Sequence, residues 1–261
     1  MILRRLGNKK KIAKEIQKHF PPHKIYIEPF FGAGGMFFNK PKAKYNIVND
    51  LDSDVFNLFN VVMNQKEELE KAFYMMPIHI DLLKHWKENE ETEPIKKALR
   101  FLFLSNFTIM GSGSGMRIGA SGGTNKNIVD DNLNETFEKL KNVQINNCDF
   151  KRFINSISFD DRKTPTETNE SLIYCDPPYL GTNDNYSNSF TEEQSKELFD
   201  TLEETRCKFV MSEFDHPFIL EQAKQRNLNV IIIGERQNLK NRRTEILVTN
   251  YDNEQQVLDF A

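Results

Sequence analysis

Seven short apolar runs of strand length recur along the 261-residue chain, and segments with helical spacing separate several of them. The segment from Thr191 to Thr205 opens with a Thr-x-x-Gln pattern, which is typical of a helix N-terminus. Alternating strands and helices favour a mostly parallel sheet covered on both faces, so we predict an α/β fold. The predicted strands are Lys24 to Phe30, Tyr45 to Asp50, Val143 to Phe150, Ser171 to Asp176, Lys208 to Phe214, Asn229 to Gly234 and Glu245 to Tyr251.

One interval, from Asp54 to about Leu140, interrupts this alternation. It contains no convincing strand, has helical spacing through Phe101 and then becomes rich in glycine. The glycine-rich residues 111–123 hold too few apolar side chains to form a core, so we predict a loop or hairpin, with a plain linker as the alternative. The sequence therefore predicts one main domain from residues 1–52 and 141–261, with residues 53–140 as an insertion.

The first 45 residues are strongly basic. They hold eleven lysines and arginines against two glutamates, a balance of +9, whereas the whole chain has a net charge of -3. A local basic surface can bind phosphates in spite of an acidic total, although a solvated helix face explains such a run equally well. Within it, the spacing of Ile12, Ile16 and Phe20 predicts a helix from Lys10 to Phe20 that ends at Pro21.

Composition argues against several classes of protein. No apolar run reaches the length of a membrane span, and no signal-peptide core follows Met1, so we expect a cytoplasmic protein. The three cysteines are odd in number and show no CxxC pair, and neither they nor the five histidines have metal-ligand spacing. We therefore expect neither structural disulfides nor a bound metal.

The most informative motif is Asp176-Pro177-Pro178-Tyr179, at the end of a predicted strand. Ligands of open α/β sheets bind beyond the carboxyl ends of the strands. There, an aspartate can accept one hydrogen of an amino group and a proline carbonyl the other, which points the nitrogen lone pair at a sulfonium methyl group. Consecutive prolines fix that carbonyl, and a tyrosine ring offers a face on which a base can stack. A tight turn after a buried strand is the alternative.

Two further motifs follow predicted strands. Glu28 to Gly35 (EPFFGAGG) runs from a strand into a glycine turn, where backbone can approach a ligand closely. Its spacing is not GxGxxG, which argues against a dinucleotide-binding dehydrogenase. Asp50 ends the next strand, where an acid can bind both ribose hydroxyls of an adenosyl group. A structural turn and a surface or capping acid are the respective alternatives.

The order of these motifs resembles the Dam-like, alpha-class (D12) DNA adenine-N6 methyltransferases over nearly the whole chain. The resemblance is carried by LRRLGNK (3–9), EPFFGAG (28–34), NDLDSD (49–54) and DPPY (176–179), with weaker matches in RFLFLSNFT (100–108), NSFTEEQ (188–194) and EILVTNY (245–251). It implies a class I, Rossmann-like, seven-stranded sheet with a mainly helical target-recognition insertion at residues 53–140. It also implies site-specific transfer of a methyl group from S-adenosylmethionine to a flipped adenine in double-stranded DNA, without metal or covalent intermediate.

The same resemblance assigns roles to individual residues. Those implied to be catalytic are Asp176, Pro177, Pro178 and Tyr179. Those implied to contact the cofactor are Arg5, Lys9, Phe31, Gly32, Ala33, Gly34, Asp50, Asp149, Phe150 and Asp176.

Five residues are predicted to contact DNA. Arg117, in the glycine-rich segment, can bond guanine O6 and N7 from the major groove, with a phosphate contact as the alternative. Arg242 and Arg243 lie in a basic stretch before the last strand that can hold phosphates, although a solvated loop fits equally well. Lys10 and Asn188 complete the set.

The sequence is compatible with several other activities. An enzyme acting on RNA adenine would use similar motifs, whereas one acting on a protein glutamine typically has Asn, and one acting on cytosine N4 usually has Ser, where this chain has Asp176. From another class, a DNA-binding module with a degenerate cofactor site also fits. The sequence leaves open whether a cognate restriction endonuclease accompanies the protein and whether it is a monomer or a weak dimer.

Overall fold

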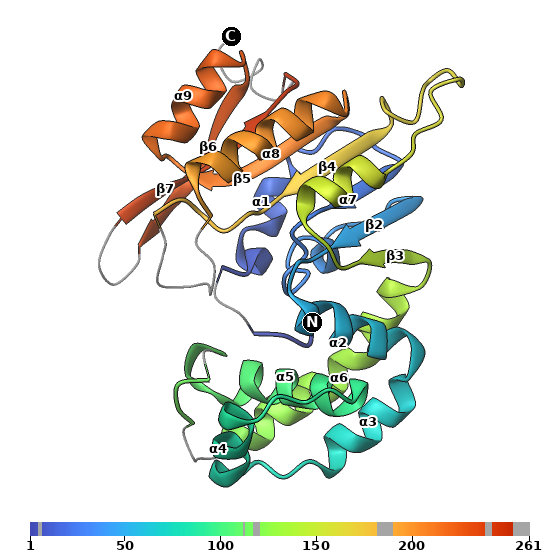
Figure 1. The fold of residues 1–261 in the computed structure, drawn as a ribbon, viewed down its shortest axis with the longest axis vertical. Helices are drawn as coiled ribbons and strands as arrows, with labels where there is room; N and C mark the ends of the chain where they lie inside the picture. The colour runs from blue at the N-terminus through green and yellow to red at the C-terminus, as the bar shows by residue number, and fades with distance from the viewer. Residues whose placement is uncertain (5–6, 112, 117–120, 182–189, 238–241, 253–261) are drawn as a thin grey trace. The chain divides into compact units, whose positions relative to one another are not determined.

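The computed structural model describes residues 1–4, 7–111, 113–116, 121–181, 190–237 and 242–252. Within these residues, seven strands form one sheet in the order β3-β2-β1-β4-β5-β7-β6 (Figure 1). The predicted α/β fold with a seven-stranded sheet is therefore confirmed. The strands are β1 (Ile25–Glu28), β2 (Tyr45–Asn49), β3 (Val143–Asn146), β4 (Ser171–Cys175), β5 (Lys208–Phe214), β6 (Asn229–Gln237) and β7 (Arg242–Thr249).

The central strands are parallel. β1 pairs with β2 and β4, and β4 pairs with β5, all in parallel, whereas β7 runs antiparallel to both β5 and β6. Because parallel neighbours end at the same edge of a sheet, the carboxyl ends of β2, β1, β4 and β5 lie next to one another. This edge is where the sequence places its most informative motifs.

The chain divides into two compact units. The first comprises Met1–Lys11, Gly32–Asn39 and Asp50–Asn147, and the second comprises Ile12–Phe31, Lys40–Asn49 and Cys148–Ala261. Helices of the first unit are η1 (Lys9–Lys11), η2 (Phe37–Asn39), α2 (Ser53–Asn64), α3 (Lys66–Met75), α4 (Ile80–Glu88), α5 (Pro94–Phe107), η3 (Ile109–Gly111) and α6 (Ser121–Leu140). Those of the second are α1 (Ala13–Gln17), α7 (Phe150–Ser156), α8 (Glu192–Glu204) and α9 (Pro217–Gln225).

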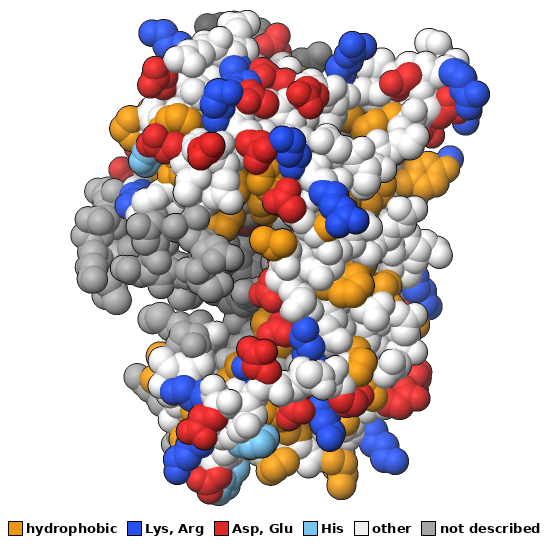
Figure 2. Space-filling view, in the orientation of Figure 1, with side chains coloured by type: hydrophobic (Ala, Val, Ile, Leu, Met, Phe, Trp, Pro, Cys, Tyr) orange, Lys and Arg blue, Asp and Glu red, His pale blue; other side chains and the backbone are white. Residues whose placement is uncertain are grey.

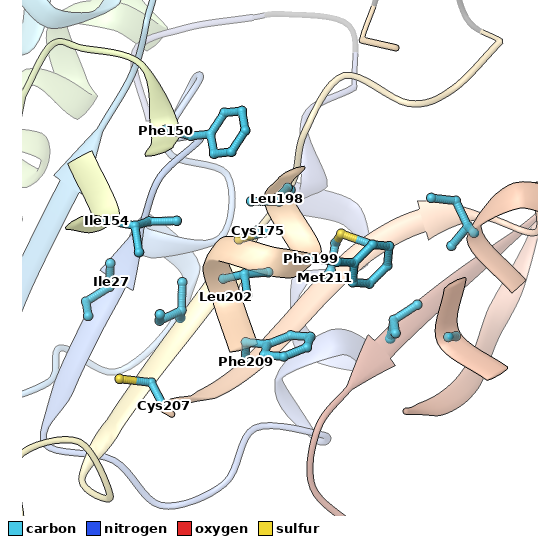
Figure 3. Close-up of a cluster of buried hydrophobic side chains, with 14 of the residues drawn as sticks. Ile27, Phe150, Ile154, Cys175, Leu198, Phe199, Leu202, Cys207, Phe209 and Met211 are labelled. Carbon is cyan, nitrogen blue, oxygen red and sulfur yellow. The ribbon is translucent and has the colours of Figure 1, made fainter. Parts of the chain in front are cut away.

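A continuous apolar core lies under one face of the sheet in the second unit. Side chains from α7, α8 and α9 pack there against alternate residues of β1, β4, β5 and β7, and Figure 3 shows Ile27, Phe199 and Phe209 within this cluster. The opposite face carries the intervening residues, where the Phe20 ring lies 5.6 Å from the Tyr174 ring. The alternation of side chains along each strand thus buries both faces, as expected for parallel strands.

Helix α8 begins as its sequence predicts. The Thr191 side chain accepts from the Gln194 backbone N–H and the Gln194 side chain accepts from the Thr191 N–H, which makes a complete capping box. Acidic side chains on its outer surface pair with lysines, including Glu197 with Lys151 and Asp200 with Lys196. Such pairing accounts for the acidic and basic side chains that Figure 2 shows interspersed on this face.

Four predicted segments differ from the structure, and one of them is the loop expected to hold Arg242 and Arg243, which is the beginning of β7. The strand expected over Val143 to Phe150 ends at Asn146, because Asp149 caps α7 by accepting from the Lys151 N–H at 2.9 Å. The helix expected over Lys10 to Phe20 is only Ala13–Gln17, because the following N–H groups of His19 and Phe20 bond three residues back, as in a 3₁₀ turn.

The fourth difference concerns the glycine-rich segment. Its last residues, 121–123, form the start of α6 rather than part of a loop or hairpin. The low helix propensity of Gly122 and Gly123 is overridden because they extend a long helix whose later residues, such as Val129 and Leu133, are buried. Nearer its beginning, an antiparallel bridge joins Thr108 to Met116.

Candidate active site

The Asp-Pro-Pro-Tyr segment follows directly after β4. All five residues of β4 are buried, and the chain leaves the sheet at Asp176. Asp176 and Pro178 are half-buried, whereas Pro177 is buried. The structure thus places the predicted catalytic carboxylate at the carboxyl edge of the sheet, next to the end of β1.

Tyr179 is held firmly beside this edge. Its hydroxyl donates to Glu245 Oε1 at 2.6 Å, and its ring meets the Phe214 ring edge-on, with centroids 4.7 Å apart. Burial, followed by the charges of Asp176 and Glu245, raises the pKa of Tyr179 well above its ordinary value. The hydroxyl therefore stays protonated and can act as the donor to Glu245. Stacking of a base on this ring remains a prediction.

The two residues after Tyr179 are also bound by side chains of the sheet. The Leu180 N–H donates to Glu213 Oε1 at 2.8 Å. Arg243 donates from Nη1 to Leu180 O at 3.2 Å and from Nη2 to Gly181 O at 3.1 Å. Sequence analysis missed Glu213 and Glu245, although an acid within each of the apolar strands KFVMSEF and EILV was a visible signal.

A buried asparagine ties the ends of β1 and β2 together. The Asn49 side chain donates to Pro29 O at 3.0 Å and to Cys148 O at 2.9 Å, and it accepts from the Cys148 N–H at 3.1 Å. The Phe31 N–H donates to Asn49 O at 2.9 Å. Asn49, which was not singled out from the sequence, therefore fixes both the start of the glycine turn and the start of the segment that leads to Asp149.

Three phenylalanines cluster at the same edge in the second unit. The Phe30 ring lies 5.6 Å from Phe150 and 6.0 Å from Phe190, and Phe150 lies 6.0 Å from Phe190. Phe150 is buried, whereas Phe30 and Phe190 are half-buried. Asp149 is exposed beside this group at the N-terminus of α7. The arrangement offers an apolar wall next to an acid, which suits a flat heteroaromatic ring with polar edges.

The glycine turn lies in the first unit together with Asp50. The Gly32 N–H donates to Asp50 Oδ2 at 2.5 Å, and Asp50 Oδ1 accepts from the Asp52 N–H at 2.9 Å. Gly32 has φ +52°, and a Cβ placed on it would meet no atom within 4 Å. Gly34 also has a positive φ, and Ala33 between them is buried. The turn thus leaves space beside its own backbone, as a ligand-binding turn requires.

The predicted N-terminal cofactor motif packs against this turn within the first unit. A Cβ on Gly35 would lie 2.3 Å from Asn8 Oδ1 and 2.9 Å from Lys9 N, so only glycine fits there. Lys9 is 3% exposed, and its ammonium donates to Gly7 O at 3.4 Å. Lys10 is exposed. The structure therefore brings Lys9, the glycine turn and Asp50 into one unit.

Several predicted residues lie outside what the structure describes. Arg5, Arg117 and Asn188 are not among the described residues, and of Arg242 only the backbone, in β7, is described. Across the described ranges, no helix is long and apolar enough to cross a membrane. The same ranges contain no group of three or more His, Cys, Asp or Glu side chains that could hold a metal ion.

Comparison with known proteins gives a consistent result. A family model described as D12 class N6 adenine-specific DNA methyltransferase matches residues 6–244. The DNA adenine methylase of Escherichia coli K12 is 26% identical over 248 residues, which cover 86% of this chain and 84% of that protein. The DNA adenine methylase of Haemophilus influenzae is 30% identical over 186 residues, covering 66% of this chain and 61% of that protein. The family resemblance carried by the sequence motifs is thereby confirmed.

Proposed function

The chain belongs to the family of D12 class N6 adenine-specific DNA methyltransferases, and from this premise we propose that it transfers a methyl group from S-adenosylmethionine to N6 of an adenine flipped out of duplex DNA. Among the activities left open by the sequence, this membership favours DNA adenine over RNA adenine, cytosine N4 and a protein amide. The observation that carries the proposal is the position of Asp176, half-buried where β4 leaves the sheet, directly before two prolines.

Asp176 and Pro177 bind the target amino group. An adenine amino nitrogen is a poor nucleophile, because its lone pair is delocalised into the ring. The Asp176 carboxylate accepts one of its hydrogens and the Pro177 carbonyl accepts the other, so that the lone pair turns towards the methyl carbon. Pro178 restricts Pro177 to extended backbone and thereby fixes the direction of that carbonyl. The Tyr179 ring offers a stacking surface for the flipped base.

The residues of the glycine turn fit an adenosyl ligand. Gly32 leaves open space beside the backbone, and two backbone N–H groups orient the Asp50 carboxylate, an acceptor of the kind that ribose hydroxyls require. We assign Lys9, Phe31 to Gly34, Asp50, Asp149 and Phe150 to this binding role. When bound, the cofactor would supply a sulfonium methyl group whose carbon–sulfur bond breaks as the bond to N6 forms, with the neutral thioether leaving and one N6 proton released to solvent, so the transfer needs neither a metal nor a covalent enzyme intermediate.

DNA recognition is assigned to the helical insertion at residues 53–140. Outside the insertion, Lys10, Asn188 and Arg242 contribute further DNA contacts, with Arg242 on backbone phosphates, and within it Arg117 reads a base, as the sequence predicts. The two contacts of Arg243 with backbone carbonyls favour a role within the protein for this residue.

A methylation map tests the function. The chain is expressed in cells that lack adenine methylation, and modified bases are located across the genome, with an empty-vector culture as the control. We expect N6-methyladenine within one short sequence, at a frequency far above the control. Methylation of cytosine N4 or of RNA alone, or a genome without N6-methyladenine in spite of folded protein, would overturn the proposal.

A further inference from the structure

We propose that Arg243, Glu213 and Glu245 are positioning residues that hold the segment Tyr179–Gly181 and thereby fix the Asp176-Pro177 pair against the end of β4. The inference rests on the proposed function, since it assigns a task within that reaction. The three side chains come from the adjacent antiparallel strands β5 and β7. They are distant in sequence from the segment that they hold.

The two acids bind consecutive residues of the segment. Glu245 and Glu213 are each 1% exposed. Glu245 accepts from the Tyr179 hydroxyl at 2.6 Å and Glu213 accepts from the Leu180 N–H at 2.8 Å. The second Glu213 oxygen accepts from the N–H of Phe214, its own neighbour, at 2.6 Å, which fixes the carboxylate plane. Hydrogen bonds to a charged acceptor are the strong ones, so buried carboxylates are well suited to hold a loop in one place.

Arg243 is the third side chain that binds this segment. Its planar guanidinium bonds the carbonyls of Leu180 and Gly181 through different nitrogens, at 3.2 and 3.1 Å, and it lies 5.4 Å from the Phe214 ring centroid. Phe214 is also the ring on which Tyr179 packs. A side chain engaged with two carbonyls and a ring holds the loop, whereas the sequence predicts a phosphate contact or a solvated loop residue for Arg243.

The two roles of Arg243 predict different kinetics. A phosphate contact contributes to binding in the ground state and in the transition state alike, so its loss raises KM for DNA and leaves kcat unchanged. Loss of a phosphate contact also reduces the slope of log affinity against log salt concentration by about one. A positioning residue affects the geometry of the reacting groups, and small misplacements lower kcat by about 10- to 100-fold.

Arg243→Gln and Arg243→Lys are therefore compared with the wild-type protein on duplex DNA that carries the mapped site. Arg226→Gln is the matched control, because Arg226 also stacks on a phenylalanine, 5.5 Å from the Phe199 centroid, but pairs with Asp200 and Glu203 on α8. For each protein, kcat, KM for DNA and its salt slope are measured, with urea unfolding as the check of folding.

We expect Arg243→Gln to lower kcat at saturating DNA by about 10-fold or more, with KM within about twofold and an unchanged salt slope. Arg243→Lys keeps the charge, but its single ammonium cannot reproduce the planar fork, so kcat should stay low. Arg226→Gln should keep the wild-type kcat. If Arg243→Gln does not fold, Arg243→Lys decides the question.

A raised KM with unchanged kcat, restored by Arg243→Lys, would overturn the positioning role and support the phosphate contact. An equal loss of kcat in Arg226→Gln would also overturn it, because the effect would then be general. If the wild-type protein transfers no methyl group to DNA, the proposed function itself fails.

Discussion

Acidic side chains are buried at the carboxyl edge of the sheet, each with a donor beside it. Glu28, Glu213 and Glu245 are exposed by only 1–2%. Glu28 accepts from the Tyr26 hydroxyl at 2.7 Å, as Glu245 accepts from Tyr179. A buried carboxylate without partners costs several kcal/mol, so such residues persist where their hydrogen bonds define the position of neighbouring groups. Their presence within apolar strands is a signal that a sequence can provide.

Lys40 leads to a prediction about pH. The side chain is 7% exposed, its ammonium lies 4.1 Å from the Tyr26 ring centroid, and it donates to Pro41 O at 2.8 Å. Burial lowers its pKa from 10.5 to about 8. Between about pH 8 and pH 10.5, Lys40 is mostly deprotonated in the folded protein but protonated in the unfolded chain. The free energy of unfolding should therefore rise with pH, by about 1 kcal/mol from pH 7 to pH 9.

Urea unfolding at both pH values measures this effect, with Lys40→Met as the control. The variant keeps an apolar stem but lacks the titrating group. It should therefore lose the rise in stability that the wild-type protein shows. An identical pH dependence in the two proteins would mean that Lys40 does not cause it.

At the scale of single elements, the capping box of α8 can be tested directly. Thr191→Ala removes the oxygen that accepts from the Gln194 N–H, which should lower the free energy of unfolding by about 1 kcal/mol. Thr191→Ser keeps that oxygen and should remain close to wild type. Chemical denaturation of the three proteins gives the comparison, and equal losses in both variants would show that the threonine methyl group, rather than the cap, is responsible.

The glycines near η3 offer a matched pair. Gly111 and Gly113 have nearly the same φ, +69° and +71°, so an alanine at either position carries the same backbone strain. A Cβ at Gly111 would lie 2.5 Å from Arg4 O, whereas at Gly113 the nearest atom, Leu104 Cδ2, is 3.8 Å away. Gly111→Ala should therefore be the more destabilising change, by at least about 1 kcal/mol.

Thermal unfolding of the two alanine variants measures that difference. Arg4 is held by Ser105, whose hydroxyl accepts from Arg4 N and donates to Arg4 O, so the chain there has little freedom to move away. Equal destabilisation of the two variants would mean that the backbone at Arg4 shifts away from the added Cβ with little change in free energy.

For the molecule as a whole, the sheet could be predicted because each strand is marked locally by an apolar run. The errors lie where a local pattern competes with another interaction. The sequence predicts one strand from Val143 to Phe150, yet the Asp149 cap turns its end into α7. The glycines at 122–123 predict a loop, yet they form the first turn of a helix whose burial depends on distant residues.

The residues of the candidate site also differ in whether the sequence alone could identify them. Asp176, Gly32 and Asp50 follow strands and could be found from sequence position alone. Asn49 and the contacts of Arg243 could not, because they depend on which strands are neighbours: Asn49 bonds Pro29 and Cys148, and Arg243 reaches Leu180 across the sheet. Hydrogen bonds between residues far apart in the chain leave no local pattern.

The most decisive measurement is methyl transfer by Asp176→Ala. Purified wild-type or variant protein, in excess over duplex DNA that carries the mapped site, is mixed with that DNA and S-adenosylmethionine. Methyl incorporation into the DNA is followed over a single turnover. Because the variant lacks the acceptor that holds the amino group, its rate should fall by about 100-fold or more, while DNA binding and the free energy of unfolding stay close to wild type. A rate within a few fold of wild type would contradict the role of Asp176 and, with it, the proposed mechanism.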